Sequence, residues 1–303
     1  MEILFASPRR LPKPAKVPGR VVVVDIAFAS EASGADSFQK ITRSFIDGLG
    51  PRLVAWVDHH DSAEHARYRS DPRFVLHTKA EHGACPEIIT PALVARFGPV
   101  DTIVAHNDFD GIVSAAKWQR GGIEPYAGAD DDARAVDTRI GTPGPIGRDM
   151  DRALRARPRD TALVDTIAKL LVGGATDEAL WVPVRKAARE LDAIEAHTRA
   201  IATGYQRLRP GVALVDASRE QNYDKTLLLL LGQERERVSV VLDRDTVTLA
   251  AAFDSGLNFL TMLGLSGGMP TRVSVPTSAL PQVWRALGVD PVEAESALAS
   301  ARL

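Results

Sequence analysis

Residues 53–60 read LVAWVDHH, an apolar run that ends directly in one aspartate and two histidines. Residues 102–111 show the same arrangement as TIVAHNDFDG, and residues 21–25 show it as VVVVD. Short apolar runs of this kind are typical of strands that are buried on both faces of a parallel sheet. Ligands collect beyond the carboxyl ends of such strands, so we expect the three strands to bring imidazole and carboxylate groups to one rim.

Imidazole and carboxylate groups together form a donor set that suits Mn²⁺ or a comparable divalent ion. Each string also has a simpler interpretation. Asp58-His59-His60 is short enough to be a polar surface turn, and Asn107 and Asp108 could merely cap a helix. Because three such strings follow three apolar runs in one chain, the sequence favours a metal site.

Segments with helical spacing separate the predicted strands. Apolar residues recur at helical intervals in residues 36–49, where Gly50-Pro51 ends the pattern, and again in residues 88–97. Residues 8–14 contain too much proline for a helix or a central strand. The alternation of strands and helices predicts an α/β fold with a parallel, doubly wound sheet.

The C-terminal part predicts a second, smaller α/β domain. Its strands are expected at residues 212–215, 238–242, 246–250 and 272–275, with a helix at 258–265. A hairpin-like turn at residues 243–245 joins the middle two strands. A helical pattern over residues 184–197 suits a connector. We therefore expect a metal-binding domain at residues 1–175, a connector helix at 176–205 and a second domain at 206–303.

Composition agrees with two domains of ordinary size, since the chain has 303 residues, 45% hydrophobic and 25% charged. Its formal net charge of −2 argues against a protein that coats long duplex nucleic acid. No segment has the length of a membrane span, and residues 1–5 lack the features of a secretion signal. The single Cys85 cannot form an internal disulfide. These features lead us to expect a cytoplasmic protein with no membrane partner.

The strings resemble the signatures of the DHH phosphoesterase superfamily. This family includes single-strand exonucleases, short-oligoribonucleotide hydrolases, cyclic-dinucleotide phosphodiesterases and family II pyrophosphatases. Residues 106–111 are similar to its first motif, Val24-Asp25 to its second, and residues 58–60 to its third. The order differs, because the string similar to the first motif comes last. We interpret this as a circular permutation, which a parallel sheet tolerates because it fixes which strand ends meet.

The fourth motif of the family is a further aspartate. Six aspartates between residues 128 and 151 are candidates: Asp130, Asp131, Asp132, Asp137, Asp149 and Asp151. Val136-Asp137-Thr138 is most similar to the Asp-Thr step of some members, so we select Asp137. A solvated acidic loop remains the alternative for each aspartate taken singly.

The resemblance implies two divalent metal ions, with Mn²⁺ preferred and Mg²⁺ or Co²⁺ as alternatives. The implied ligands are Asp25 as the bridge, His106 and Asp108 on one ion, and Asp110, His59 and Asp137 on the other. It also implies that His60 contacts the scissile phosphate or its leaving group, and that Asp58 orients the imidazoles.

The C-terminal domain resembles the DHH-associated domain, in which a Gly-Gly-His loop faces the metals across a cleft and holds substrate phosphate. Met269 stands here in place of the usual histidine, and a thioether cannot donate a hydrogen bond. The backbone N–H groups of Gly267 and Gly268, together with Arg272, are therefore expected to bind phosphate, unless the substrate differs from the common one. A tight turn without a ligand is the simpler interpretation of Gly267-Gly268.

The resemblance implies a Mn²⁺-dependent phosphodiesterase that hydrolyses short oligonucleotides or small nucleotide phosphodiesters with a metal-activated water. The acidic net charge and the lack of a long basic or aromatic stripe disfavour a processive nuclease. One alternative is a phosphatase that acts on a nucleotide or another small phosphorylated molecule. Another is a catalytically degenerate nucleotide-binding protein. The expected partner is the small substrate, and a homodimer is left open.

Overall fold

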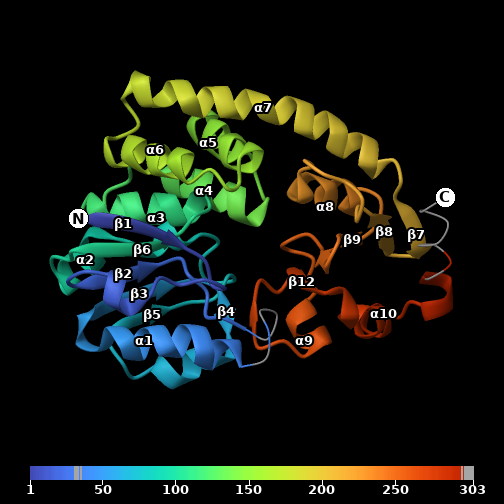
Figure 1. Ribbon diagram of the computed structural model, residues 1–303, viewed down its shortest axis with the longest axis horizontal. Helices are drawn as coiled ribbons and strands as arrows, with labels where there is room; N and C mark the ends of the chain where they lie inside the picture. The colour runs from blue at the N-terminus through green and yellow to red at the C-terminus, as the bar shows by residue number, and fades with distance from the viewer. Residues whose placement is uncertain (31–33, 35, 295, 297–303) are drawn as a thin grey trace. The chain divides into compact units, whose positions relative to one another are not determined.

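The computed structural model describes residues 1–30, 34, 36–294 and 296. It divides into two compact units, Met1–Glu190 and Leu191–Leu303, and the boundary falls inside the long helix α7 (Glu178–Ala202) (Figure 1). This helix occupies the segment that the sequence assigns to a connector. Each unit contains its own five-stranded sheet together with helices, which confirms the predicted α/β class.

The first unit is built on a sheet with the strand order β1-β6-β2-β3-β5. Its strands are β1 (Glu2–Ala6), β2 (Val21–Val24), β3 (Leu53–Asp58), β5 (Phe74–Leu76) and β6 (Thr102–His106). Every neighbouring pair runs parallel. The three strands predicted from the apolar runs are adjacent in the order β6-β2-β3, and the prediction of a parallel sheet is confirmed.

Alternate residues of the central strand β2 pack on opposite faces of this sheet. Val21 and Val23 belong to a buried cluster with residues of α1 (Ser44–Leu49). Val22 and Val24 belong to another cluster, with residues of α3 (Phe109–Gln119). Figure 1 shows α1 on one side of the sheet and α3 on the other. Helices cover both faces, which explains why the strand is a continuous apolar run rather than an alternating one.

Two helices begin and end close to the residues predicted from the sequence. A π-helical segment (Phe38–Arg43) leads directly into α1, and Gly50 follows with a φ of +54° that favours glycine. Helix α2 (Pro91–Phe97) has proline at its first position, where no backbone donor is needed. The Thr90 hydroxyl caps α2 by accepting a hydrogen bond from the Leu93 amide at 3.2 Å.

Residues 129–172 form three helices that the sequence did not resolve: α4 (Ala129–Thr138), α5 (Pro145–Ala156) and α6 (Thr161–Val172). Ala129, Ala133 and Val136 are buried on one side of α4, within a core cluster that also includes residues of α3, α5 and α6. The alternative of a solvated acidic loop is therefore wrong for residues 129–138, because small apolar residues at helical spacing give this acidic segment a face to bury.

The second unit has a mixed sheet with the order β12-β10-β9-β8-β7. Its strands are β7 (Gln206–Arg209), β8 (Val212–Asp216), β9 (Val238–Leu242), β10 (Thr246–Ala250) and β12 (Arg272–Pro276). Strands β8 and β9 run parallel, and the other neighbours are antiparallel. Four of these strands match the predicted ones, and the hairpin between β9 and β10 is present.

Helices cover both faces of this second sheet. Helix α8 (Lys225–Gln233) contributes to one buried cluster, and α9 (Phe259–Leu263) and α10 (Leu280–Leu287) contribute to another. The sequence predicted α9 but neither α8 nor α10. The remaining short elements are β4 (Asp61–Ser62), β11 (Gly267–Gly268) and 3-10 turns at Pro14–Lys16, Gly50–Arg52, Ala63–Tyr68, Cys85–Ile88 and Thr277–Ala279. None of the helices in the described residues is both long and apolar enough to cross a membrane.

Candidate metal centre

The polar strings meet at one rim of the first sheet. In the parallel register, Val24 of β2 lies opposite Val57 of β3 and Ala105 of β6. The residues that follow these three positions therefore emerge at the same edge, among them Asp25 and His106. This is the topology that the permutation hypothesis requires, while the permutation itself remains a hypothesis.

Asp25 lies at the centre of this rim. Its side chain is fully buried, and neither carboxylate oxygen has a hydrogen-bond partner among the described residues. Burial raises the pKa of Asp25 well above its ordinary value, and the nearby carboxylates of Asp110 and Asp108 raise it further. The residue also has a φ of +56°, which is uncommon without glycine and marks local strain. A buried carboxylate that accepts no hydrogen bond and lies among like charges is the environment that a bound cation would relieve.

One group of possible ligand atoms combines Asp25 with His106 and Asp108, all within 4.8 Å of one another. His106 Nδ1 lies 2.7 Å from Asp108 Oδ2 and 3.8 Å from Asp25 Oδ2. Burial alone would lower the pKa of His106, but the Asp108 carboxylate raises it. The other oxygen of Asp108 caps α3 by accepting a hydrogen bond from the Gly111 amide at 3.3 Å. The capping interpretation and the ligand interpretation thus apply to different oxygens of the same side chain.

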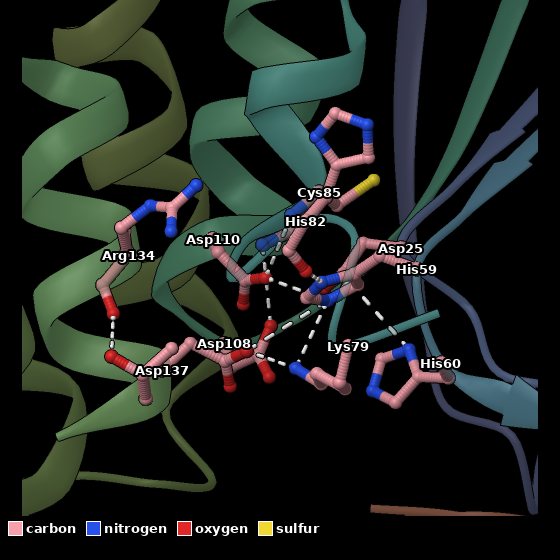
Figure 2. Close-up of polar contacts among 12 residues, drawn as sticks. Asp25, His59, His60, Lys79, His82, Cys85, Asp108, Asp110, Arg134 and Asp137 are labelled. Atoms are coloured by element: carbon pink, nitrogen blue, oxygen red, sulfur yellow. Dashed lines mark hydrogen bonds and ion pairs between the residues drawn. The ribbon is translucent and has the colours of Figure 1, made fainter. Parts of the chain in front are cut away.

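A second group of possible ligand atoms combines His59 with Asp110 and Asp137. His59 Nε2 lies 3.3 Å from Asp110 Oδ2 and 3.8 Å from Asp137 Oδ2, and it is 3.2 Å from Asp25 Oδ1. His59 Nδ1 donates to the backbone carbonyl of His82 at 2.9 Å. This bond orients the ring, so that Nε2 is the nitrogen that faces the carboxylates (Figure 2). Asp25 lies beside both groups, and it also forms a third possible ligand group with His59 and His60.

His60 and Asp58 form a pair next to these groups. His60 Nδ1 lies 2.8 Å from Asp58 Oδ1 and 3.9 Å from Asp25 Oδ1. Burial opposes the charge on Asp58, but His60, with smaller contributions from His59 and His65, lowers the pKa of Asp58 to about 2. The His60 side chain is 19% exposed whereas that of His59 is fully buried. His60 is therefore the histidine of this string that can reach a bound molecule.

Sequence reasoning missed Lys79, whose side chain is only 2% exposed. Its ammonium forms an ion pair with Asp137 Oδ2 and lies 3.0 Å from His59 Nε2 (Figure 2). Burial would lower the pKa of Lys79, but Asp137, Asp110 and Asp25 raise it. The available signal was the apolar strand β5, which ends at Leu76 at the same rim, three residues before Lys79.

Gly111 permits the close approach of α3 to the rim. A Cβ at this position would lie 2.5 Å from the His106 carbonyl oxygen and 2.9 Å from Asp25 Oδ2. Both distances are too short for any side chain, because a Cβ atom needs more room than this. The glycine of HNDFDG is therefore required by packing around Asp25.

A cavity of about 650 Å³ lies along the edge strand β1 in the first unit. Asn107, between His106 and Asp108 in the sequence, is among its lining residues, together with Arg10 and Arg159. Its volume falls in the range of small-molecule sites, about 300–1,000 Å³.

The remaining sequence-predicted residues belong to the second unit. Gly267 and Gly268 form β11, and Gly268 has a φ of +130° that requires glycine. Arg272 begins β12, and its Nη1 lies 3.4 Å from Thr226 Oγ1 of α8. The phosphate-binding role of these three residues stays a prediction.

No protein-family model matches the chain, and no curated protein matches it. Among solved structures, the chain is similar to the pGpG-specific phosphodiesterase PggH from Vibrio cholerae. The two are 13% identical, the TM-score is 0.47, and the match covers 89% of this chain and 97% of PggH.

Proposed function

We propose that this protein is a metal-dependent phosphoesterase of the DHH type, with small nucleotide phosphodiesters or short oligonucleotides as substrates and Mn²⁺ as the preferred ion. One observation carries the proposal: Asp25 is a fully buried carboxylate without a hydrogen-bond partner in the described part of the chain, and it adjoins both groups of imidazole and carboxylate ligands. Such a carboxylate is costly to bury unless it coordinates a cation.

The donor set fits a divalent ion. Imidazole nitrogens and carboxylate oxygens suit Mn²⁺, Zn²⁺ and related ions, and these atoms converge within 4.8 Å in each group. When bound, divalent ions of such a centre supply a water of lowered pKa and stabilise charge on the phosphoryl oxygens. Asp25 and these two ligand groups would hold the ions. His60 is grouped only with Asp25 and His59, and we assign it to the substrate because it is the more exposed of the two histidines.

His60 then acts on the substrate. Asp58 accepts a hydrogen bond from His60 Nδ1, so that the opposite ring nitrogen can face a phosphate or a leaving oxygen. Since Asp58 is fully buried and His60 is partly exposed, the pair has the orientation of a positioned acid. The proposed role of Asp58 is to fix the orientation of the His60 ring.

The substrate class follows from size and charge. A cavity of about 650 Å³ accommodates a small ligand, and its lining carries two arginines, Arg10 and Arg159, together with two acidic residues, Glu2 and Asp165. The chain as a whole carries a formal charge of −2, which disfavours long nucleic acids. Both features support a nucleotide-sized phosphodiester.

A substrate panel tests the proposal. Linear dinucleotides including pGpG, cyclic dinucleotides, bisphosphorylated nucleosides and pyrophosphate are each incubated with Mn²⁺, with chelator, and with the Asp25→Asn variant. We expect hydrolysis of a linear dinucleotide in Mn²⁺ and none in the other two conditions. Release of inorganic phosphate from monoesters alone would favour the phosphatase. The absence of turnover on every compound would identify a binding protein.

A further inference from the structure

The described part of the first unit places an ammonium group among the possible metal ligands. We propose that Lys79 is the resident cation of the group formed by His59, Asp110 and Asp137. The protein then binds one divalent ion tightly, at Asp25, His106 and Asp108, and admits a second ion only when it displaces the Lys79 ammonium. This inference rests on the proposed function, since it concerns the same metal centre.

The geometry supports competition for the same atoms. The Lys79 ammonium contacts His59 Nε2 at 3.0 Å and pairs with Asp137 Oδ2. These are the atoms that a metal ion in this group would use. A nitrogen lone pair cannot accept a hydrogen bond and coordinate a metal at the same time, so each ion entering this position removes the bond from Lys79.

Lys79 is held in place by its own loop. The amide of His77 donates to the carbonyl of Asp58 at 2.9 Å, which ties the start of the loop to the end of β3. The Thr78 amide donates to Glu81 Oε2 at 2.8 Å, and the Lys79 amide lies 3.4 Å from Asp61 Oδ2. The Lys79 side chain is therefore a fixed part of the rim rather than a surface chain that folds inward.

Electrostatic repulsion by Lys79 also distinguishes the two proposed metal positions. An ammonium beside a divalent ion is strongly repelled at distances of a few ångströms, even with the effective dielectric of a protein. The Lys79 ammonium contacts His59 and Asp137, whereas His106 and Asp108 pair with each other. An ion held by His106 and Asp108 therefore displaces no contact of Lys79, and Asp25 is the ligand of that group that also interacts electrostatically with Lys79.

The test is a metal titration of the full chain, with activity left aside. Metal-free wild type and Lys79→Met are titrated with Mn²⁺ by calorimetry, and the metal content is measured after desalting. We expect one tightly bound ion in the wild type and two in Lys79→Met, with the affinity of the second site raised by about tenfold or more. Electron paramagnetic resonance should show an isolated Mn²⁺ ion in the wild type and an exchange-coupled pair in the variant.

Lys117→Met is the matched control. Lys117 is also buried and pairs with a carboxylate, Asp130, but neither residue belongs to the ligand groups. This variant should bind Mn²⁺ as the wild type does. Lys79→Gln serves as a second variant if Lys79→Met does not fold, because it keeps a polar group while it removes the charge.

The outcomes separate this inference from the proposed function. Two ions of similar affinity in the wild type, or no gain of a second ion in either folded Lys79 variant, would overturn the role of Lys79 and leave the phosphoesterase proposal intact. A wild type that binds no divalent ion would overturn both.

Discussion

Asp25 is the residue on which the proposed metal centre depends. Its carboxylate is buried beside Asp108 and Asp110, and its pKa is raised by burial and by these neighbours. A group with a raised pKa in the folded state contributes stability at low pH, and that contribution is lost as the pH rises above the ordinary value of 3.8. Ionisation of Asp25 is therefore unfavourable in the metal-free protein, and a bound metal ion would offset this cost.

Asp25→Asn should separate stability from function. We expect the metal-free variant to be more stable than the metal-free wild type at neutral pH, by about 1–3 kcal/mol, because a buried charge is removed. The stabilisation that Mn²⁺ gives the wild type should disappear, and hydrolysis should fall by about a thousandfold or more. Urea unfolding with and without Mn²⁺ measures both effects, with exposed Asp47→Asn as the control. A variant that is less stable without metal and is still stabilised by Mn²⁺ would contradict this.

Asp58 titrates in the opposite direction. His60 lowers its pKa to about 2 from the ordinary value of 3.8. A lowered pKa contributes stability above the unfolded value, and this stability is lost as the pH falls through the folded value. Asp58→Asn should therefore be less stable than the wild type by about 2 kcal/mol at pH of about 5, and the difference should vanish as the pH approaches about 2. Denaturant unfolding across this range checks the prediction, and a difference that does not change with pH would count against it.

At the scale of elements, the junction between β6 and α3 controls the geometry of the centre. Gly111→Ala would place a Cβ 2.5 Å from the His106 carbonyl oxygen and 2.9 Å from Asp25 Oδ2. We expect a loss of about 1–3 kcal/mol in unfolding free energy, together with weaker Mn²⁺ binding. Gly173→Ala at the end of α6 is the control, since its Cβ would make ordinary contacts of 3.4 Å or more. Equal behaviour of the two variants would show that this junction has room to adjust.

Strand ends were the part of the fold that the sequence predicted best. An apolar run followed by Asp or His is a local signal, and β2, β3 and β6 all begin and end near the predicted residues. Strand β1 was not predicted, because its short apolar run at residues 3–6 was interpreted only in relation to a secretion signal, although a turn at Pro8-Arg9 follows it. Helix α4 was not predicted, because its many acidic residues make the helical spacing of its few small apolar residues difficult to recognise in the sequence.

Lys79 was not predicted as a site residue for a different reason. Lys79 is 20 residues from His59 and 58 residues from Asp137, so only the folded sheet brings the three together. Lysine is also not a residue type of the imidazole and carboxylate donor set that indicates a metal site. Asp137, in contrast, was found because its Asp-Thr step resembles a family motif, and α4 carries it to the rim.

At the scale of the whole molecule, the two units are proposed to have different functions. The first is proposed to hold the metal ions, and the second is proposed to bind substrate phosphate through Gly267, Gly268 and Arg272. Arg272→Ala should raise the Michaelis constant several-fold while kcat and metal content stay near their wild-type values, because it removes binding common to ground and transition states. Steady-state kinetics and metal analysis test this, with exposed Arg244→Ala as the control from the same unit. Loss of metal from Arg272→Ala would assign the residue another role.

The most direct test of the central claim is where a metal ion binds. Anomalous scattering from crystals equilibrated with Mn²⁺ locates the ion without reference to activity. We expect a strong peak within coordination distance of Asp25, His106 and Asp108. Crystals at saturating Mn²⁺ in which Asp25 and Asp108 remain uncoordinated would contradict the assignment of this rim as a metal centre.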